Sequence, residues 1–389
     1  MSTDALNADA HIFDGGPPLR LQRTIGLIKR DQLHERRRAA IAVCVAWIPL
    51  AILAIADTLL FSRPTARAFF ADLSVHARYL LAIPALILAE ADCIPRFERI
   101  VRQFVDSGLI DISNRANYDS AIVSTRRLLN SPVSEIVAAL ISYFIVIGIM
   151  FWVERAIVPS WQIGADGRVS AAGWWHIIVS LPLLLILLLG WLWRLLLWGR
   201  FLFLMSRLDL QLLPSHPDHV GGLKFVSSYL RGFRLISFAL GALVAGSLAE
   251  RVIYLGAEFK SFKNLIIALI GFILVLSVGP LTVFIEKLRS TKRRGIFEYG
   301  ALANHVGKVF ESKWLSSTDS ERAVLETPDF SATTDYYSVA ANVYEMRDAP
   351  FNLKDLIGPV VPALVPFLIV ALLSVPPQAV IDALIKLLM

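Results

Sequence analysis

Residues 174–197 of the chain read WWHIIVSLPLLLILLLGWLWRLLL, a stretch in which Arg194 is the only Asp, Glu, Lys or Arg. A helix needs about 20 mostly apolar residues to cross the hydrocarbon core of a bilayer. The stretch has that length, and tryptophans stand at both of its ends, where aromatic side chains favour the membrane–water interface. It therefore predicts a transmembrane helix.

Further apolar runs lie on both sides of this stretch, at 39–61, 79–94, 133–158, 233–255, 265–285 and 356–375. The run 79–94 is short for a span, whereas the others are long enough. Hydrophobic residues make up 56% of the 389-residue chain, charged residues only 18%, and the mean hydropathy is +0.61. We therefore predict an all-α polytopic transmembrane bundle of about seven membrane helices, with the lipid bilayer as its first partner.

Lys and Arg side chains are concentrated in alternate connections between the apolar runs. The rich segments are 1–38, 95–131, 200–232 and 287–355. The positive-inside rule makes these segments cytoplasmic, which places the N-terminus in the cytoplasm and the C-terminus in the periplasm. The asymmetry also accounts for the net charge of +6. Because no stripe of interleaved aromatic and basic residues accompanies it, we expect no nucleic-acid partner.

The same boundaries divide the chain into four parts. They are a cytoplasmic basic amphipathic segment (1–38), a six-helix membrane region (39–286), a cytoplasmic helical section (287–355), and the seventh membrane helix with a short tail (356–389). The membrane region includes a connection at 95–131, expected to form two helices broken near 108–114, and a loop at 200–232. In the cytoplasmic section we expect helices near 296–314 and 336–346, with a loop at 316–334 between them.

Two acidic residues, Glu90 and Asp92, interrupt the second apolar run. Glu90 lies about 16 Å along a helix that begins near Tyr79, at 1.5 Å per residue. An ionisable group at membrane depth is costly, so it marks a candidate transport path. The alternatives are a buried ion pair with Arg194, or a helix end that reaches the surface early.

Asp57, Glu154 and Glu250 fall near the predicted outer ends of three membrane helices. Together they could form an acidic vestibule that concentrates cations. The alternative is the ordinary charge found at membrane interfaces.

The last apolar run contains Pro359, Pro362 and Pro366. Proline removes backbone donors and leaves carbonyl oxygens without partners. A helix broken in this way is tolerated at membrane depth where it lines a cavity or packs on protein. The run is therefore a second candidate for a transport path, against the alternative that prolines are simply common in membrane helices.

The densest polar motif is PSHPDHVGGL at 214–223. His216, Asp218 and His219 offer imidazole and carboxylate ligands that suit zinc or manganese, although their spacing is not a standard ligand pattern. The alternative is a rigid turn, with Asp218 bound to backbone amides and Gly221–Gly222 at positive φ. No other cofactor is indicated, and the absence of a P-loop, a nucleophile elbow and an HExxH motif disfavours an enzyme.

Several short motifs carry a resemblance that spans most of the chain. They are AWIPL at 46–50, RYLLAIP at 78–84, GWLWR at 190–194, LDL at 208–210 with HPD at 216–218 and GGL at 221–223, EYG at 298–300 and KW at 313–314. With these motifs the chain resembles a family of uncharacterised bacterial multi-pass inner-membrane proteins. The resemblance implies an inner-membrane location and the fold, and it implies no activity.

Three classes of function are compatible with these features. The leading hypothesis is an ion or small-solute channel or transporter, with Glu90 and the proline-containing seventh helix along the path. The second is a membrane-anchored regulator or scaffold that acts through its cytoplasmic helices. The third is a metal-dependent membrane enzyme at His216, Asp218 and His219. Whether the protein is a homo-oligomer is left open by the sequence.

Overall fold

The computed structural model of the protein describes residues 15–16, 35–152, 158–163, 167–254, 256–315 and 329–373. Within these ranges the regular structure is helical, apart from two isolated β-bridges. The all-α prediction is confirmed. The basic segment predicted to lie on the inner leaflet falls outside the described residues except for Gly15, Gly16 and 35–38.

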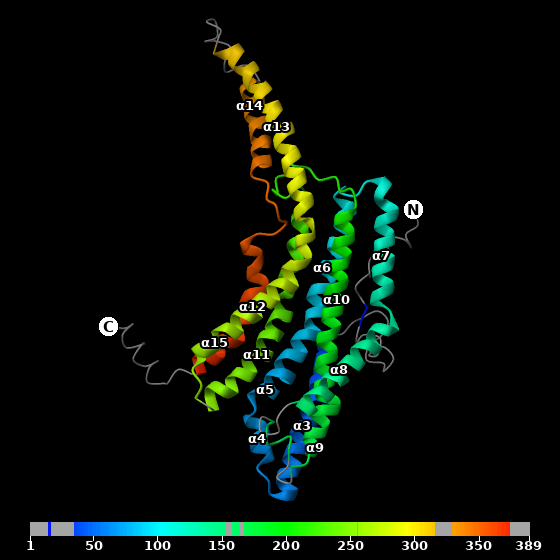
Figure 1. The fold of residues 1–389 in the computed structure, drawn as a ribbon, viewed down its shortest axis with the longest axis vertical. Coiled ribbons are helices and arrows are strands. Elements are labelled where there is room, and N and C mark those ends of the chain that lie inside the picture. The colour runs from blue at the N-terminus through cyan, green and yellow to red at the C-terminus, as the bar shows by residue number, and fades with distance from the viewer. Residues whose placement is uncertain are drawn as a thin grey trace, which may run out of the picture.

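Long helices form a bundle, and successive bundle helices alternate in direction (Figure 1). They are α3 (Glu35–Phe61), α6 (Ile83–Asp106), α8 (Pro132–Trp152), α10 (Leu181–Arg207), α11 (Arg234–Tyr254), α12 (Lys263–Val278) and α15 (Ile357–Leu373). Short helices α4 (Thr65–Ala71), α5 (Leu73–His76) and α9 (Ala171–Trp175) close one end of the bundle. At the other end α7 (Arg115–Leu129) follows the break at Gly108, which has a φ of 71°. The predicted break near 108–114 is confirmed.

Six described helical segments are long and apolar enough to cross a membrane. They are Glu35–Phe61, Pro132–Trp152, Ala171–Arg207, Lys224–Tyr254, Phe259–Trp314 and Leu353–Leu373. Among the described residues the candidates number six and not the predicted seven or so, because α6, which contains the second run, is not one of them. One face of α6 is buried against α3, α10 and α11, so this helix carries polar and charged residues that a lipid-facing helix would not.

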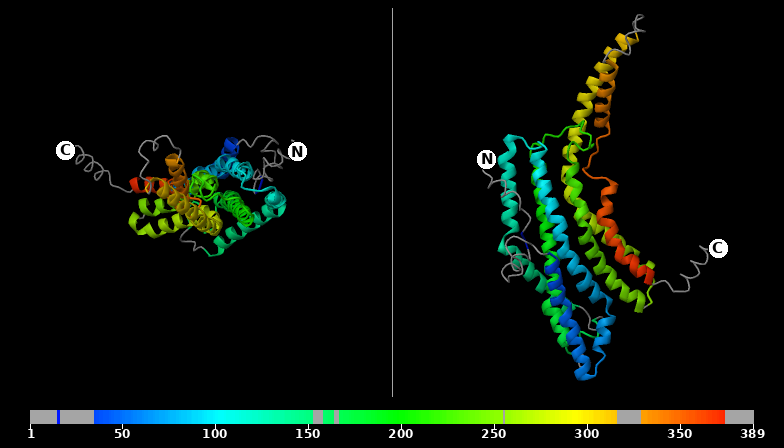
Figure 2. Two further views of the ribbon diagram at one scale, coloured as in Figure 1. Left: turned by 90° about the horizontal axis from the view of Figure 1, so that it is seen from above. Right: turned by 180° about the vertical axis from the view of Figure 1, so that it is seen from behind.

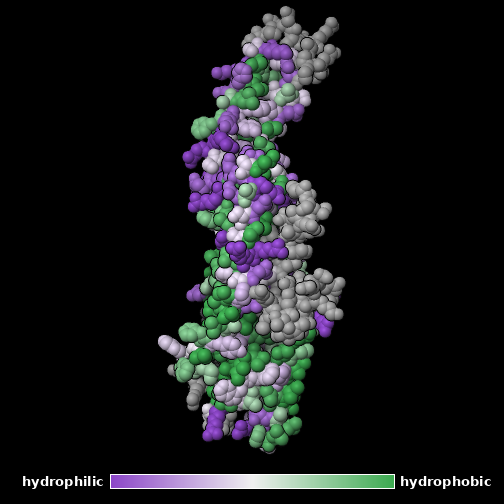
Figure 3. All heavy atoms as spheres, turned by 90° about the vertical axis from the view of Figure 1, so that its right-hand side faces the viewer, coloured by the Kyte–Doolittle hydropathy of each residue, from purple (hydrophilic) through white to green (hydrophobic). Residues whose placement is uncertain are grey.

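A helical hairpin stands out from the bundle (Figures 1 and 2). Helix α13 (Ile285–Trp314) continues α12 through a short 3₁₀ segment, and α14 (Asp329–Tyr344) returns alongside it. Hydrophobic side chains gather over the bundle, and hydrophilic ones over the end that carries the hairpin (Figure 3). We call residues 295–315 together with α14 the arm.

The two helices of the arm pack in an antiparallel heptad register. Aromatic residues of α14 lie over small or aromatic residues of α13, in the pairs Tyr344 on Gly300, Tyr337 on Gly307 and Phe330 on Trp314. A Cβ atom at Gly307 would lie 2.9 Å from the Tyr337 hydroxyl, so the small residues on α13 make room for the aromatic ones.

The predicted helices at 296–314 and 336–346 are confirmed, but the predicted loop at 316–334 is wrong for residues 329–334. Helix α14 begins at Asp329, and Phe330 packs against Phe310 and Trp314 with ring centroids 4.8 and 5.0 Å apart. The ion pair of Asp329 with Lys313 adds to this contact. The Ser and Thr residues of this stretch have low helix propensity, which is why a loop was predicted. The tertiary contacts of Asp329 and Phe330 stabilise a helix there instead.

Candidate functional site

The Glu90 carboxylate is fully enclosed within the bundle. Its Oε2 accepts a hydrogen bond from Arg38 Nη1 at 2.6 Å, and its Oε1 lies 3.0 Å from Arg194 Nη2. All three side chains are 1% exposed. Because Arg38 is on α3, Glu90 on α6 and Arg194 on α10, the cluster joins three helices. We call these three residues the charge clamp.

Arg194 makes two further contacts. Its Nε donates to the carbonyl oxygen of Gly15 at 3.2 Å, and its guanidinium lies 5.3 Å from the Trp191 ring centroid. Gly15 and Gly16 are both buried, and a Cβ atom at Gly15 would lie 1.9 Å from Asn130 Oδ1. A piece of the N-terminal segment is therefore seated against the clamp.

Glu90 forms a buried ion pair with Arg194, which was one of the alternatives predicted from the sequence. Arg38 was missed, because it follows Arg36 and Arg37 and reads as one of several cytoplasmic basic residues. Helical phase separates them: Arg36 and Arg37 are exposed, whereas Arg38 points into the bundle. A transport role for Glu90 stays a prediction, and it would require the carboxylate to leave two guanidinium groups.

Asp92 lies two residues further along α6 and ties it to a different helix. Its Oδ1 accepts from Arg96 Nη2 at 2.8 Å, and its Oδ2 accepts from Arg234 Nη2 of α11 at 2.9 Å. Arg234 is exposed, so this pair is at the rim of the bundle rather than inside it. The two acidic residues of the second run therefore connect α6 to α3, α10 and α11 between them.

The predicted acidic vestibule is only partly covered by the described residues. Asp57 accepts a hydrogen bond from the Thr65 hydroxyl and lies 3.8 Å from Arg63, both of them local neighbours. Glu154 lies outside the described residues, and Glu250 is half-buried on α11.

Asp72 is a buried carboxylate that was not predicted from the sequence. It accepts a hydrogen bond from Trp161 Nε1 at 2.8 Å and caps α5 by accepting a hydrogen bond from the amide of Val75. Its position directly before a helix was the available signal.

Helix α15, which the sequence predicted as a broken seventh membrane helix, differs from its predicted form. Residues Ile357–Leu373 form one continuous helix, α15, with Pro362 and Pro366 inside it. The expectation of a broken helix is therefore wrong. Helix α15 packs on α11 so closely that a Cβ at Gly241 would lie 2.2 Å from the Ala363 carbonyl oxygen. This contact with α11 holds the helix in place despite its missing backbone donors.

The motif at 214–223 forms the rigid turn that was the alternative prediction to a metal site. Asp218 Oδ1 accepts from the amides of Val220 (2.8 Å) and Gly222 (3.1 Å), and Oδ2 accepts from the amide of Lys224 (3.1 Å). Gly221 and Gly222 have φ values of 65° and 93°. Burial alone would raise the pKa of the Asp218 carboxyl, but the three amide hydrogen bonds outweigh it, and the pKa lies below its usual value.

The side chains proposed as metal ligands are not arranged as a ligand set. Asp218 Oδ1 lies 2.9 Å from His216 Nδ1, but the His219 ring lies toward Glu345, 3.8 Å away. Among the described residues, no group of three His, Cys, Asp or Glu side chains could hold a metal ion. The metal hypothesis thus stays a prediction without support from the geometry.

The same loop connects the bundle to the base of the arm, and we call residues 208–224 the joint. Arg347, which follows α14, donates its amide to His219 O (2.7 Å) and its Nη2 to Asp218 O (3.1 Å). Ser215 lies 3.1 Å from the Tyr299 hydroxyl of α13. On the bundle side, the amide of Gln211 donates to Leu109 O at 2.9 Å.

No protein-family model, no curated protein and no solved structure matches the chain. The resemblance to bacterial inner-membrane proteins therefore stays a prediction.

Proposed function

We propose that the protein is a membrane-anchored scaffold that holds the arm as a docking element for a partner helix. The observation that carries the proposal is the arm itself, a helical hairpin outside the bundle that leaves large apolar side chains exposed. Val309 is 52% exposed on α13, and Phe330 and Val339 are 39% and 40% exposed on α14. Exposed apolar side chains of this density are more typical of an interaction surface than of a free helix.

A groove of about 410 Å³ runs along the arm. Its walls include His305, Val309, Phe310 and Trp314 from α13 and Ala332 and Tyr336 from α14. A hydrophobic groove between two helices is the usual receptor for the apolar face of an amphipathic helix. We therefore take an amphipathic helix as the partner.

A docking element is useful only if its position is fixed, and two features support a fixed position. The heptad register locks α13 to α14, and the joint locks the base of both helices to the bundle. The charge clamp adds rigidity to the bundle below, because each of its members would be left as a buried charge if the others moved.

The proposal includes the orientation. Lys and Arg are concentrated at the arm end of the bundle, so we place the arm in the cytoplasm and the bundle in the inner membrane of a bacterium. The transporter hypothesis remains the second candidate, because the Glu90 carboxylate is the feature that a proton- or cation-coupled path would need.

Site-specific photo-crosslinking tests the proposal. A photoreactive amino acid at Thr333, on the wall of the groove, should form a covalent adduct with one discrete partner in intact cells. Val309→Asp places a charge inside the groove and should remove most of that adduct. Leu302→Asp is the matched control, because Leu302 is exposed to a similar degree on the same helix but is not part of the groove wall.

Retention of the adduct in the Leu302→Asp variant and its loss in Val309→Asp would support the groove as the docking site. Equal loss in both variants, or no discrete adduct from Thr333, would contradict the proposal. Thermal unfolding of each purified variant confirms that the arm is still folded.

A further inference from the structure

A second groove lies where the chain leaves the apolar part of the bundle, between the end of α10 and the beginning of α13. Its volume is about 450 Å³. Phe203 and Val283 form its apolar part, and Ser206, Arg207, Lys287 and Ser290 form most of its polar part. An apolar floor beneath hydroxyl groups and cations is the arrangement that a phospholipid requires at the membrane–water interface.

The cations of this groove are available to an anion. Arg207 is exposed, its guanidinium lies 5.0 Å from the Phe203 ring centroid, and no carboxylate of the described residues pairs with it. Lys287 Nζ donates to Ser206 O at 3.3 Å and also to Leu208 O, the carbonyl groups that end α10. Its positive charge is not neutralised by these carbonyl groups.

One carboxylate, Glu286, lines the groove, and a second, Asp209, lies close enough to Lys287 to interact with its charge. The cations still outnumber them, because Arg207 and Lys287 are joined by Arg293 and Arg294, which follow on the same side of α13, seven residues after Glu286 and Lys287. Arg294 is only weakly engaged, 3.9 Å from Glu298. The local charge therefore favours an anionic headgroup over a zwitterionic one.

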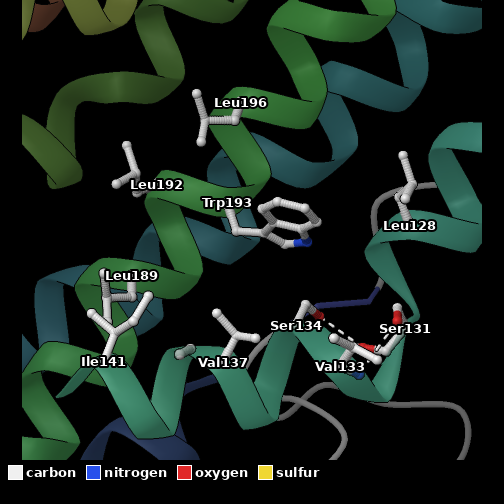
Figure 4. A pocket seen from close by; sticks show the side chains of 11 residues that line it. Leu128, Ser131, Val133, Ser134, Val137, Ile141, Leu189, Leu192, Trp193 and Leu196 are labelled. Carbon is white, nitrogen blue, oxygen red and sulfur yellow. Dashed lines mark hydrogen bonds between the residues drawn. The ribbon is translucent and has the colours of Figure 1, made fainter. Parts of the chain in front are cut away.

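Apolar side chains continue down α10 beyond this groove. Phe203, Leu196 and Leu192 recur at helical spacing and are all exposed, and Pro280 packs against Gly199 between Phe203 and Leu196. Leu196 and Leu192 also line a third groove, of about 370 Å³, between α8 and α10. Figure 4 shows Leu196 and Leu192 along α10, Val137 and Ile141 on α8, and the Trp193 ring of α10 lying toward Ser134. From Phe203 to Leu192 the helix rises about 16 Å, roughly the thickness of one leaflet of the hydrocarbon core.

We propose that an anionic glycerophospholipid binds along α10, with its phosphate at Arg207 and Lys287 and an acyl chain on the Phe203–Leu192 face, reaching the groove between α8 and α10. The cationic groove and the apolar groove are thus two ends of one site. The site lies beneath the first turns of α13, so the bound lipid would hold the base of the arm at the membrane surface.

Native mass spectrometry of the full chain in detergent tests this proposal, with phosphatidylglycerol and phosphatidylcholine of identical acyl chains as probes. The wild-type protein should retain phosphatidylglycerol more strongly than phosphatidylcholine. Arg207→Gln should lower the retention of phosphatidylglycerol about fivefold, the effect of one basic residue at a membrane surface. Arg127→Gln removes an exposed arginine that lines neither groove, and it should change retention less than twofold by the same measure.

Equal retention of the two lipids would overturn the proposal. An equal loss in Arg207→Gln and Arg127→Gln would also overturn it, because it would mean that the anionic lipid follows the total positive charge. Inorganic phosphate is the third probe. If phosphate alone displaces the bound lipid at millimolar concentration, the headgroup is the whole ligand and the acyl-chain part of the site is wrong.

Discussion

Two carboxylates of this protein are held in opposite ways. Glu90 in the bundle is neutralised by arginine side chains from two other helices, and the clamp members are separated by 52 or more residues in the sequence. Asp218 in the joint is held by three backbone amides within six residues of itself. The clamp is therefore a tertiary device that joins helices, whereas the Asp218 turn shapes one loop so that it can bind both the bundle and the arm.

The difference predicts unequal responses to mutation. Removing one partner of a buried ion pair leaves an uncompensated charge that water cannot reach. Removing a carboxylate from a half-buried loop leaves amides that water can partly satisfy. The expected effects therefore decrease from the clamp to the joint.

Glu90→Gln should have the largest effect. The substitution keeps the shape of the side chain but leaves the Arg38 and Arg194 charges enclosed, and we expect a loss of about 3–5 kcal/mol of stability. Thermal unfolding in detergent measures it. Glu298→Gln is the control, since Glu298 is exposed and its pairing with Arg294 should contribute less than about 1 kcal/mol.

A paired variant separates the charge from the packing. Adding Arg194→Gln to Glu90→Gln removes one of the uncompensated charges, so part of the lost stability should return. If Glu90→Gln alone were as stable as the wild-type protein and changed ion flux in proteoliposomes, Glu90 would be a transport group and not a clamp.

Asp218→Ala should cost about 1–2 kcal/mol, because the amides of Val220, Gly222 and Lys224 lose their common acceptor. Hydrogen exchange of the peptides that contain these amides should accelerate, while exchange in α6 stays unchanged. Asp209→Ala, an exposed aspartate at the start of the joint, is the control and should stay within about 0.5 kcal/mol. Acceleration in both variants would mean that the joint depends on net charge and not on the turn.

Acidification should also destabilise the joint, but by less than the Asp218→Ala substitution. The pKa of Asp218 is lower in the folded protein than in the unfolded chain, so its contribution is present above about pH 4 and is lost as the pH falls through the folded-state pKa. Hydrogen exchange measured between pH 6 and pH 3, corrected for the intrinsic pH dependence, should show the joint opening below about pH 4. An opening near pH 6 would implicate the histidines instead.

Arg347→Gln should have the smallest effect, under about 1 kcal/mol, because the backbone hydrogen bond from its amide to His219 O survives. What it should change is the spread of arm positions. Spin labels at Lys308 on the arm and Val123 on α7 should give a broader distance distribution in the variant than in the wild-type protein. An unchanged distribution would show that the Asp218 carbonyl contact does not fix the arm.

The sequence predicted the parts of this molecule that depend on local composition. Apolar runs identified the spans, and charged residues inside two of these runs, Glu90 and Arg194, suggested a buried ion pair as one alternative. Pro217, Asp218 and the two glycines after them predicted a turn from local backbone preferences. In each case the deciding residues lie within one element, or they are charged residues in an apolar run, which have few possible ion-pair partners.

The parts that could not be predicted depend on helical phase or on distant contacts. Arg38 differs from Arg36 and Arg37 only in the direction that α3 gives it, and the contact between Gly15 and Arg194 joins residues 179 positions apart. The heptad spacing of Gly300, Gly307 and Trp314, matched by Phe330, Tyr337 and Tyr344, was readable in the sequence. It was the one available signal for the packing of the arm.

The most direct test of the account is the reactivity of Glu90 in native membranes toward a hydrophobic carbodiimide, which attacks protonated carboxyl groups inside the bilayer. The wild-type protein should show no modification of the peptide that contains Glu90, because both carboxylate oxygens face guanidinium groups and the side chain is 1% exposed. Modification of Glu90 that increases as the pH falls would show a carboxyl that exchanges protons, and it would contradict the clamp in favour of a transport path.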